Sequence, residues 1–201
     1  MSFIYSSAQF FSKSYFNLFH NFEVIGLENI PEKTPFLLAS NHASFIDPPA
    51  LGCLVQRDIC YLARRSLFKF PFNFILNKLN AIPLQRERLD LKTLKTILKC
   101  IDRGKGVLIF PEGTRSENGE IKRAKSGIGF IVEMAKVPII PAKVIGSFQI
   151  LPKGKLFPKL GQKLIIKYGV PFNAEDEVFE LDKKTRYQKI ADLIMNRIDM
   201  L

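Results

Sequence analysis

The chain has 201 residues, of which 47% are apolar and 24% charged, and it carries 30 Lys and Arg against 19 Asp and Glu. These proportions exclude a disordered chain, a collagen and a disulfide-bonded scaffold, and the length suits one domain with a substantial core. The net charge of +11 indicates an anionic partner. The candidates are nucleic acid, a phospholipid surface, a phosphorylated substrate and an acidic carrier protein.

The first predicted element is an amphipathic helix over residues 1–21. Apolar residues recur at helical spacing along one face, namely Ile4, Ala8, Phe11, Tyr15, Leu18 and Phe22. Further phenylalanines widen this stripe, so we expect the helix to act as an anchor in the membrane interface. Packing onto the protein's own core is the alternative. The segment lacks the pattern of a signal peptide, and no apolar run is long enough to predict a spanning helix.

Residues 22–201 are predicted to form one α/β domain, because apolar runs alternate with helical patterns. The expected fold is a largely parallel central sheet flanked by helices. The predicted strands are 22–26, 35–39, 58–62, 80–84, 106–110, 138–145 and 163–168. The predicted helices are 48–55, 69–78, 90–103, 126–135 and 183–199. In the clearest of these helices, Asp90 is the expected N-cap and Gly104 follows the last turn.

The first polar cluster follows the apolar run 36–39 and contains His42 and Asp47. On one continuous helix these two side chains would point about 140° apart, so a loop must bring them together. Asp47 stands before Pro48, which predicts that Asp47 is the N-cap of the next helix. A paired His and Asp suit general base catalysis, with Asp47 orienting the imidazole. A structural His beside a plain N-cap Asp is the alternative.

Two segments hold the excess positive charge. Residues 64–105 contain 11 basic and 3 acidic residues, and residues 151–172 contain five lysines and no acid. The first segment also contains large apolar residues between positions 68 and 79. Basic residues beside large aromatic residues suit a membrane interface, whereas a core helix with a solvated basic face is the alternative.

The second polar cluster follows the predicted strand 106–110. Ligands bind at the carboxyl ends of strands in open α/β sheets, which is where Glu112, Gly113 and Arg115 fall. Gly113 allows a close backbone approach, and the planar guanidinium of Arg115 suits phosphate. Glu112 is able to accept from a substrate hydroxyl or to pair with Arg115. An ordinary turn is the alternative. The sequence has no Walker loop and no dinucleotide-binding glycine motif.

Taken together, these segments resemble the glycerophospholipid acyltransferase family, and most closely its bacterial 1-acyl-sn-glycerol-3-phosphate acyltransferases. The family motif N-H-x4-D matches Asn41, His42 and Asp47, F-P-E-G-T-R-S matches residues 110–116, and the apolar V-P-I-I-P-A stretch matches residues 137–142. The remaining motif matches loosely at residues 63–68 and 82–86, where this chain has Arg64, Arg65 and Ser66 instead of the usual lysine and acidic residue. Order and spacing agree over residues 35–145.

The resemblance implies transfer of an acyl chain from an acyl thioester to the sn-2 hydroxyl of lysophosphatidic acid, giving phosphatidic acid. His42 would be the general base and Asp47 its orienting partner. The implied substrate-binding residues are Asn41, Arg64, Arg86, Glu112, Gly113, Thr114, Arg115 and Lys125. Among these, the basic side chains would hold the phosphate, and Glu112 and Gly113 would position the glycerol. The apolar groove for the acyl chain is expected to involve residues 69–82.

The reaction implied by the resemblance needs no metal or redox cofactor. The three cysteines, Cys53, Cys60 and Cys100, have no metal-ligand spacing and fit reduced thiols in the cytosol. The donor is acyl-CoA or acyl carrier protein, and the basic segments favour the acidic carrier protein. We expect a peripheral bacterial-type protein bound to anionic phospholipid on the cytoplasmic face of the cell membrane.

Three other functions remain open from the sequence. The enzyme would acylate a different lysophospholipid or glycerol-3-phosphate, or the chain would be a membrane-binding relative without activity. A basic nucleic-acid-binding domain is the alternative from another class, although the chain contains no recognisable nucleic-acid-binding motif.

Overall fold

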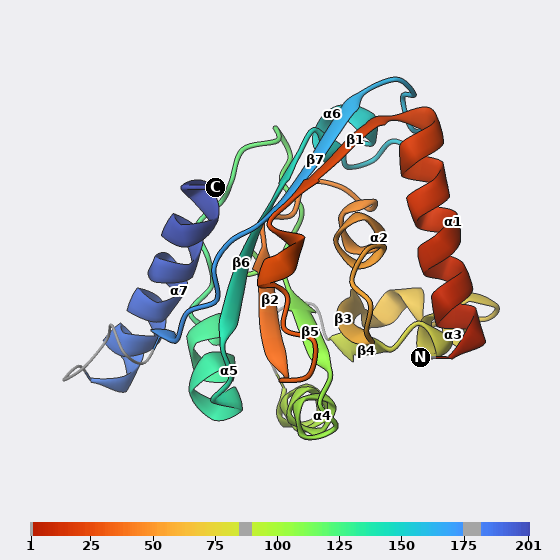
Figure 1. The fold of residues 1–201 in the computed structure, drawn as a ribbon. Helices are drawn as coiled ribbons and strands as arrows, with labels where there is room; N and C mark the ends of the chain where they lie inside the picture. The colour runs from red at the N-terminus through yellow and green to blue at the C-terminus, as the bar shows by residue number, and fades with distance from the viewer. Residues whose placement is uncertain (1, 85–89, 175–181) are drawn as a thin grey trace.

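The computed structural model describes residues 2–84, 90–174 and 182–201, and these residues form one sheet of seven strands (Figure 1). The strands are β1 (Asn21–Ile25), β2 (Phe36–Ser40), β3 (Ile59–Arg64), β4 (Ala81–Leu84), β5 (Gly106–Ile109), β6 (Ile139–Ile145) and β7 (Lys163–Tyr168). Their order across the sheet is β1-β7-β6-β2-β5-β3-β4. The β6–β7 pair is antiparallel and the other described pairs are parallel, which confirms the largely parallel sheet.

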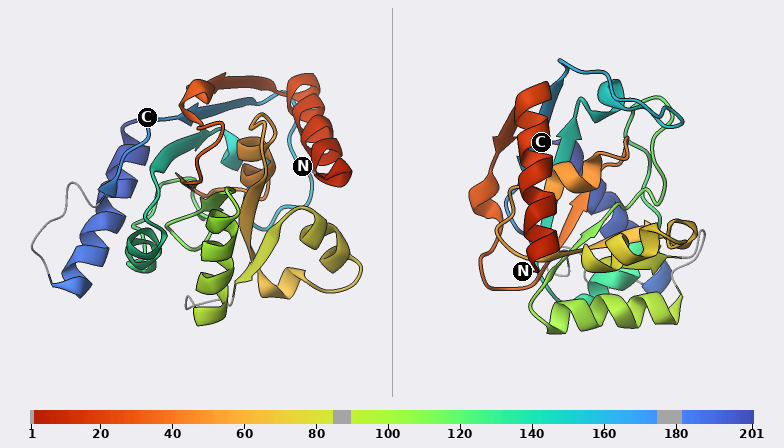
Figure 2. Two further views of the ribbon diagram at one scale, coloured as in Figure 1. Left: turned by 60° about the horizontal axis from the view of Figure 1, so that its bottom comes forward. Right: turned by 90° about the vertical axis from the view of Figure 1, so that its right-hand side faces the viewer.

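The helices form a layer on each side of this sheet. They are α1 (Phe3–Phe19), α2 (Asp47–Gly52), α3 (Phe72–Lys78), α4 (Leu91–Asp102), α5 (Gly127–Ala135), α6 (Ser147–Ile150) and α7 (Lys183–Asp199), with short 3₁₀ turns at Leu27–Asn29 and Arg65–Leu67. Helices α4, α5 and α7 cover one face, and α1 and α2 cover the other (Figures 1 and 2). The single-turn α6 was not predicted from the sequence.

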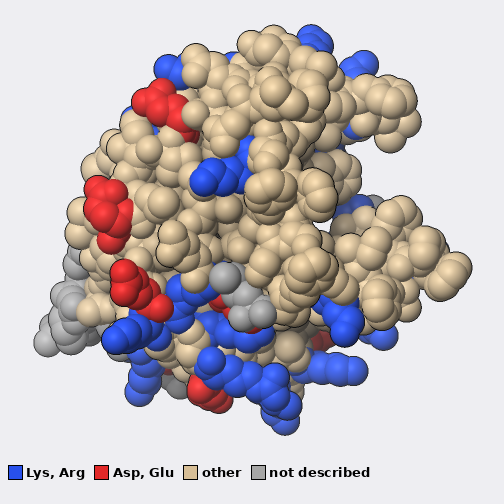
Figure 3. Space-filling model, turned by 45° about the vertical axis from the view of Figure 1, so that its right-hand side comes forward, with Lys and Arg blue, Asp and Glu red and all other residues tan. Residues whose placement is uncertain are grey.

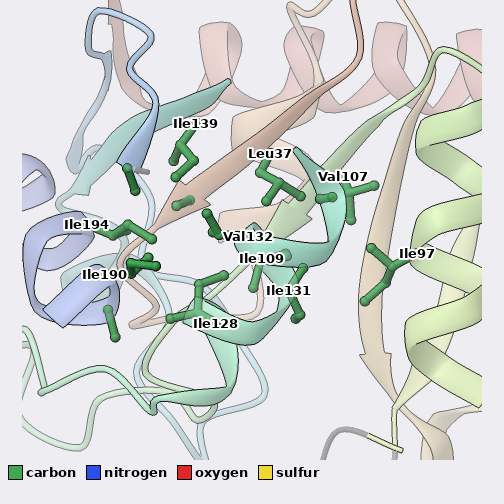
Figure 4. Packing of buried hydrophobic residues seen from close by; sticks show 14 of the residues in the cluster. Leu37, Ile97, Val107, Ile109, Ile128, Ile131, Val132, Ile139, Ile190 and Ile194 are labelled. Carbon is green, nitrogen blue, oxygen red and sulfur yellow. The ribbon is translucent and has the colours of Figure 1, made fainter. Parts of the chain in front are cut away.

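The core follows from the two-residue repeat of the strands. In β2, Leu37 and Ala39 pack under α4, α5 and α7, whereas Phe36 and Leu38 pack under α1 and α2. All five residues of β2 are buried. Figure 4 shows the first of these two layers, where strand side chains such as Leu37 meet isoleucines of α5 and α7. Burial on both faces explains why the central strands read as continuous apolar runs.

Local signals account for where the helices begin. The Asp90 carboxylate accepts from the backbone N–H of Thr93 at 2.6 Å, so this residue is the N-cap of α4 as expected. The helix predicted over 69–78 begins only at Phe72. The reason is Pro71, which disfavours helical geometry at the residue before it and stands at the N-cap position.

Helix α1 packs on the domain along one side and leaves its other side open. The Tyr5 hydroxyl contacts the Tyr61 hydroxyl at 2.9 Å and Phe16 is buried in the core. Gln9 donates to the carbonyls of Gly52, the last residue of α2, and of Val55 beyond it. The opposite side carries four exposed side chains, Phe3, Phe10, Phe11 and Leu18. The helix therefore has two apolar sides, of which the protein covers only one.

All three cysteines are free. Two of them lie in contact, because the Sγ atoms of Cys60 on β3 and Cys100 on α4 are 2.8 Å apart. The bond with Cys100, together with burial, raises the pKa of Cys60, which favours its protonated form.

Candidate active site

The two polar clusters of the sequence meet at one edge of the sheet. Strands β2 and β5 are adjacent and parallel, with Ala39 opposite Ile109, so the segments that follow them leave the sheet side by side. The backbone N–H of Ser116 donates to the carbonyl of His42 at 2.7 Å and ties the two loops together. This edge is where open α/β sheets bind ligands.

His42 and Asp47 form the expected pair. Nδ1 of His42 lies 2.8 Å from Oδ2 of Asp47, and that oxygen also accepts from the backbone N–H groups of Ala43 and Ser44 at 2.8 and 2.7 Å. The Asp47 side chain is fully buried. Because a carboxylate only accepts, the pattern assigns the proton of His42 to Nδ1 and leaves Nε2 with its lone pair.

The predicted role of Asp47 as a helix N-cap is wrong. Ile46 occupies that position, and Asp47 is the first residue of α2 and makes no capping bond to its own helix. The next two residues are Pro48 and Pro49, which have no backbone N–H to offer. The carboxylate therefore turns back to the loop that carries His42.

The imidazole of His42 is also held from its flat side. Its ring stacks on Phe110 with 3.9 Å between the centroids and 14° between the planes. The His42 side chain is 17% exposed. Within the described part of the chain, Nε2 has no hydrogen-bond partner, so it is the ring atom available to a substrate.

Glu112 braces the loop that carries His42. The side chain is 3% exposed, and its two oxygens accept from the backbone N–H groups of His42 at 2.8 Å and Lys122 at 3.1 Å. Burial raises the pKa of Glu112, although these two hydrogen bonds oppose the shift. Neither bond involves Arg115, so the structure does not show the ion pair that the sequence left open.

The bracing arrangement makes Glu112→Gln a test of structure rather than of substrate contact. A glutamine has one acceptor oxygen, and its NH₂ group would face the second backbone N–H. We expect a loss of about 1–3 kcal/mol in the free energy of unfolding, measured by urea denaturation, together with reduced turnover. A variant with wild-type stability would contradict the brace. Glu120→Gln, at an exposed position in the same loop, is the matched control.

The Arg115 guanidinium is placed to bind an anion. Its guanidinium lies over the Phe45 ring, 3.5 Å from the centroid, and its buried Nη1 has no hydrogen-bond partner among the described residues. Burial lowers the pKa of Arg115, and the nearby charge of Arg64 lowers it further. A bound phosphate would accept from the buried N–H of Arg115 and would offset the repulsion between the two guanidinium groups, so this arrangement suits a phosphate.

Lys125 lies against the glycine of the same loop. Gly113 has φ +70°, and a side chain there would meet the Lys125 Cδ atom at 3.1 Å. The backbone N–H of Lys125 also donates to the carbonyl of Pro111 at 2.9 Å. A glycine therefore suits the backbone conformation and leaves room for the lysine.

The remaining predicted site residues lie in different places. The Asn41 amide is buried and exchanges two hydrogen bonds with the backbone of Val144, at 2.9 and 2.8 Å, so it joins β2 to β6. Thr114 is exposed in the loop beside Arg115. Arg86 lies outside the described residues, so its predicted phosphate contact stays a prediction.

An apolar groove with a volume of about 310 Å³ opens beside the loop that joins His42 to Asp47. Phe45 and Pro48 line it from the loop and α2, Tyr5 lines it from α1, and Leu76 and Leu79 line it from α3 and its end. The sequence placed the groove in residues 69–82, but it did not reveal the contributions of α1 and α2, which depend on packing between distant segments.

Comparison with known proteins agrees with this architecture. The acyltransferase family model matches residues 21–145, which is more than half of the chain. This chain belongs to the acyltransferase family. It is 34% identical over 183 residues to the 1-acyl-sn-glycerol-3-phosphate acyltransferase of Bacillus subtilis, covering 89% of this chain and 87% of that protein. The resemblance drawn from the four motifs is thereby confirmed.

Longer relatives match this acyltransferase over a shorter part. The chain is 32% identical over 140 residues to the chloroplastic 1-acyl-sn-glycerol-3-phosphate acyltransferase BAT2 of Brassica napus, and it spans 40% of that protein's length. The crystal structure of the 1-acyl-sn-glycerophosphate acyltransferase PlsC from Thermotoga maritima has the same fold, with a TM-score of 0.77 and 25% identity, covering 96% of this chain and 78% of that one. Among the residues described here, no helix is long and apolar enough to cross a membrane.

Proposed function

We propose that this protein transfers an acyl chain from an acyl thioester to the sn-2 hydroxyl of 1-acyl-sn-glycerol-3-phosphate, giving phosphatidic acid. The observation that carries the proposal is a pair of atoms at one sheet edge, Nε2 of His42, whose Nδ1 is held by Asp47, and Nη1 of Arg115, neither of which has a hydrogen-bond partner among the described residues. A base and an anion-binding group at one site suit an acceptor that has both a hydroxyl and a phosphate.

In the proposed reaction, His42 Nε2 takes the proton of the acceptor hydroxyl as the oxygen attacks the thioester carbonyl. The C–O ester bond forms and the C–S bond breaks. The imidazolium then returns the proton to the departing thiolate, so the products are an ester and a thiol. Asp47 stabilises the imidazolium and keeps the ring orientation. The proton transfers need only these two side chains, so the proposal includes no metal or redox cofactor.

Arg115 and Arg64 would hold the acceptor phosphate, with Lys125 contributing a further positive charge and Arg86 assigned to the same role by its motif. Gly113 and the exposed Thr114 would contact the glycerol part. Asn41 and Glu112 would act on the substrate indirectly, since their side chains are engaged with backbone groups. The apolar groove would receive an acyl chain.

The proposed partner surface is an anionic membrane. The outward side of α1 exposes Phe3, Phe10, Phe11 and Leu18, and the segment around α3 exposes Phe70, Phe72 and Phe74. Side chains of both elements line the apolar groove between them. An amphipathic surface of this kind binds the interface without spanning it, which fits peripheral association with the cytoplasmic face.

The proposed acceptor is tested with purified protein and vesicles that carry one acceptor at a time. We expect acylated product from lysophosphatidic acid, and far less from lysophosphatidylcholine, whose phosphate is blocked, or from glycerol-3-phosphate, which lacks the first acyl chain. Acyl-CoA and acyl carrier protein are supplied in parallel as donors, and the product is identified by mass. Equal rates with lysophosphatidylcholine would contradict the proposed phosphate grip.

Substitution of the phosphate grip should change affinity more than turnover. We expect Arg115→Ala to raise KM for lysophosphatidic acid by roughly tenfold or more, with a smaller fall in kcat, because a phosphate contact is kept from ground state to transition state. Steady-state kinetics with a fixed donor concentration measure both. Arg123→Ala is the matched control, since Arg123 is exposed and pairs with Asp192 on α7. An unchanged KM would contradict the assignment.

A further inference from the structure

The loop between α6 and β7, residues 151–162, carries an unusual surface. Leu156 and Phe157 at its tip are 86% and 85% exposed, and Leu160 is also exposed. Lys153, Lys155 and Lys159 alternate with them, and the loop contains no acidic residue. Single exposed apolar residues are common on proteins, but an adjacent leucine and phenylalanine held out from a loop between lysines form an amphipathic tip.

The base of this loop is fixed to the active site. The hydroxyl of Ser44, between His42 and Asp47 in the chain, donates to the carbonyl of Leu151 at 2.7 Å. Lys153 pairs with Glu117, just beyond Arg115, at 2.7 Å. Further along, the N–H of Gly161 donates to the carbonyl of Phe19 at the end of α1. The loop therefore stands beside both catalytic segments and α1.

The exposed apolar tip projects in the same direction as the apolar segment leading into α3 (Figure 2). Figure 2 shows the α6–β7 loop and the segment leading into α3 projecting in the same direction, with the loops of the site between them. Figure 3 shows two largely uncharged projections on that side, with a hollow between them. The mouth of the site is thus flanked by two projections that each carry large exposed apolar residues.

We propose that the tip of the α6–β7 loop is a second lipid-binding element, which inserts Leu156 and Phe157 into an anionic bilayer while its lysines contact lipid phosphates. This inference rests on the proposed function, because a lipid acceptor resides in that bilayer. Contacts through α1, the α3 segment and this loop place the mouth of the site against the membrane from both sides. A lipid acceptor then reaches His42 without crossing water.

Charge favours a bilayer over a protein as the partner. Lys153 is engaged with Glu117, whereas Lys155 and Lys159 have no ion pair among the described residues. Exposed lysines directly beside apolar side chains match the order of a bilayer, in which phosphates lie just above the acyl chains. If the loop tip binds a protein and not a bilayer, it should stay in water when only vesicles are present. Adding vesicles alone therefore distinguishes a bilayer from a protein partner.

Tryptophan fluorescence tests the insertion directly, because the chain contains no tryptophan. A Phe157→Trp variant places a single reporter at the loop tip, a Phe10→Trp variant places one on the outward side of α1, and a Met200→Trp variant places one by the C-terminus, away from this surface (Figure 1). Each full-length variant is mixed with phosphatidylglycerol-containing vesicles, with and without brominated acyl chains. We expect a blue shift and bromine quenching for the first two variants and neither for the third.

Two outcomes would overturn the loop's role. If the Phe10→Trp reporter is quenched and the Phe157→Trp reporter is not, the loop stays in water while the proposed membrane partner stands. If neither is quenched, both the loop and the proposed membrane partner fail. As a second measurement, a variant with both Lys155→Glu and Lys159→Glu should have an affinity for anionic vesicles, measured by co-sedimentation, that is lower by roughly tenfold. Its turnover of a soluble short-chain acceptor should be unchanged. Undiminished sedimentation would contradict the role of the lysines.

Discussion

Replacement of His42 by alanine is expected to lower acyl transfer by about 10²–10⁴-fold, because the variant loses the only ring nitrogen placed to take the acceptor proton. The backbone bonds of residue 42 to Glu112 and Ser116 do not depend on the side chain, so the loop should keep its position. Binding of a phosphate monoester should persist, since Arg115 lies outside the deleted group. Turnover is measured as labelled product, and phosphate binding by calorimetry.

The matched control for this variant is His20→Ala. His20 is the only other histidine, its Nε2 contacts the Tyr15 hydroxyl, and it precedes β1, which β7 and β6 separate from the strand that leads to His42. We expect the control to retain transfer at the temperature where it is folded. His42→Ala with more than about a tenth of wild-type turnover would refute the general-base role.

Asp47→Asn is expected to lower kcat by about 10²–10⁴-fold with little change in volume. The hydrogen bonds from His42, Ala43 and Ser44 all go to the one oxygen Oδ2, so an asparagine oxygen in that position can keep them, but the residue no longer carries the negative charge that stabilises the imidazolium formed during proton transfer. The loss should therefore appear in kcat, with KM for the acceptor close to the wild-type value.

Asp102→Asn is the matched control, because this carboxylate is exposed at the end of α4. It should leave kcat unchanged. The Asp47→Asn variant should also be less stable, since the buried carboxylate accepts three charge-assisted hydrogen bonds. Urea denaturation separates this effect from the catalytic one. A folded variant with wild-type kcat would show that Asp47 has only a structural role.

Much of the fold could be predicted because a strand buried in a parallel sheet appears in the sequence as a short continuous apolar run. Each of the seven predicted strands is present, and the apolar runs 36–39 and 106–109 lie at the centre of the sheet where both faces are covered. The His42–Asp47 contact was also predictable, since the six residues between β2 and the Pro-Pro start of α2 leave room only for a tight loop.

What the sequence could not provide were interactions between distant segments. Asp47 was expected to cap its helix, yet Ile46 holds that position and the Asp47 carboxylate accepts from the loop that carries His42. Glu112 was assigned to substrate, but its partners are backbone N–H groups of residues 42 and 122, which no local pattern announces. Likewise, the apolar stripe of α1 left open whether the helix packs on the domain or lies in a membrane interface, and the structure shows that the domain covers one side.

The most direct measurement of the central claim is the position of the new acyl chain. Purified protein is given 1-acyl-sn-glycerol-3-phosphate with one chain and a thioester carrying a different chain, and the product is digested with phospholipase A2, which releases only the sn-2 chain. The proposed mechanism predicts phosphatidic acid from which the donor's chain is released, and no such product with His42→Ala. A product that releases the acceptor's original chain, or full formation of the product by His42→Ala, would contradict it.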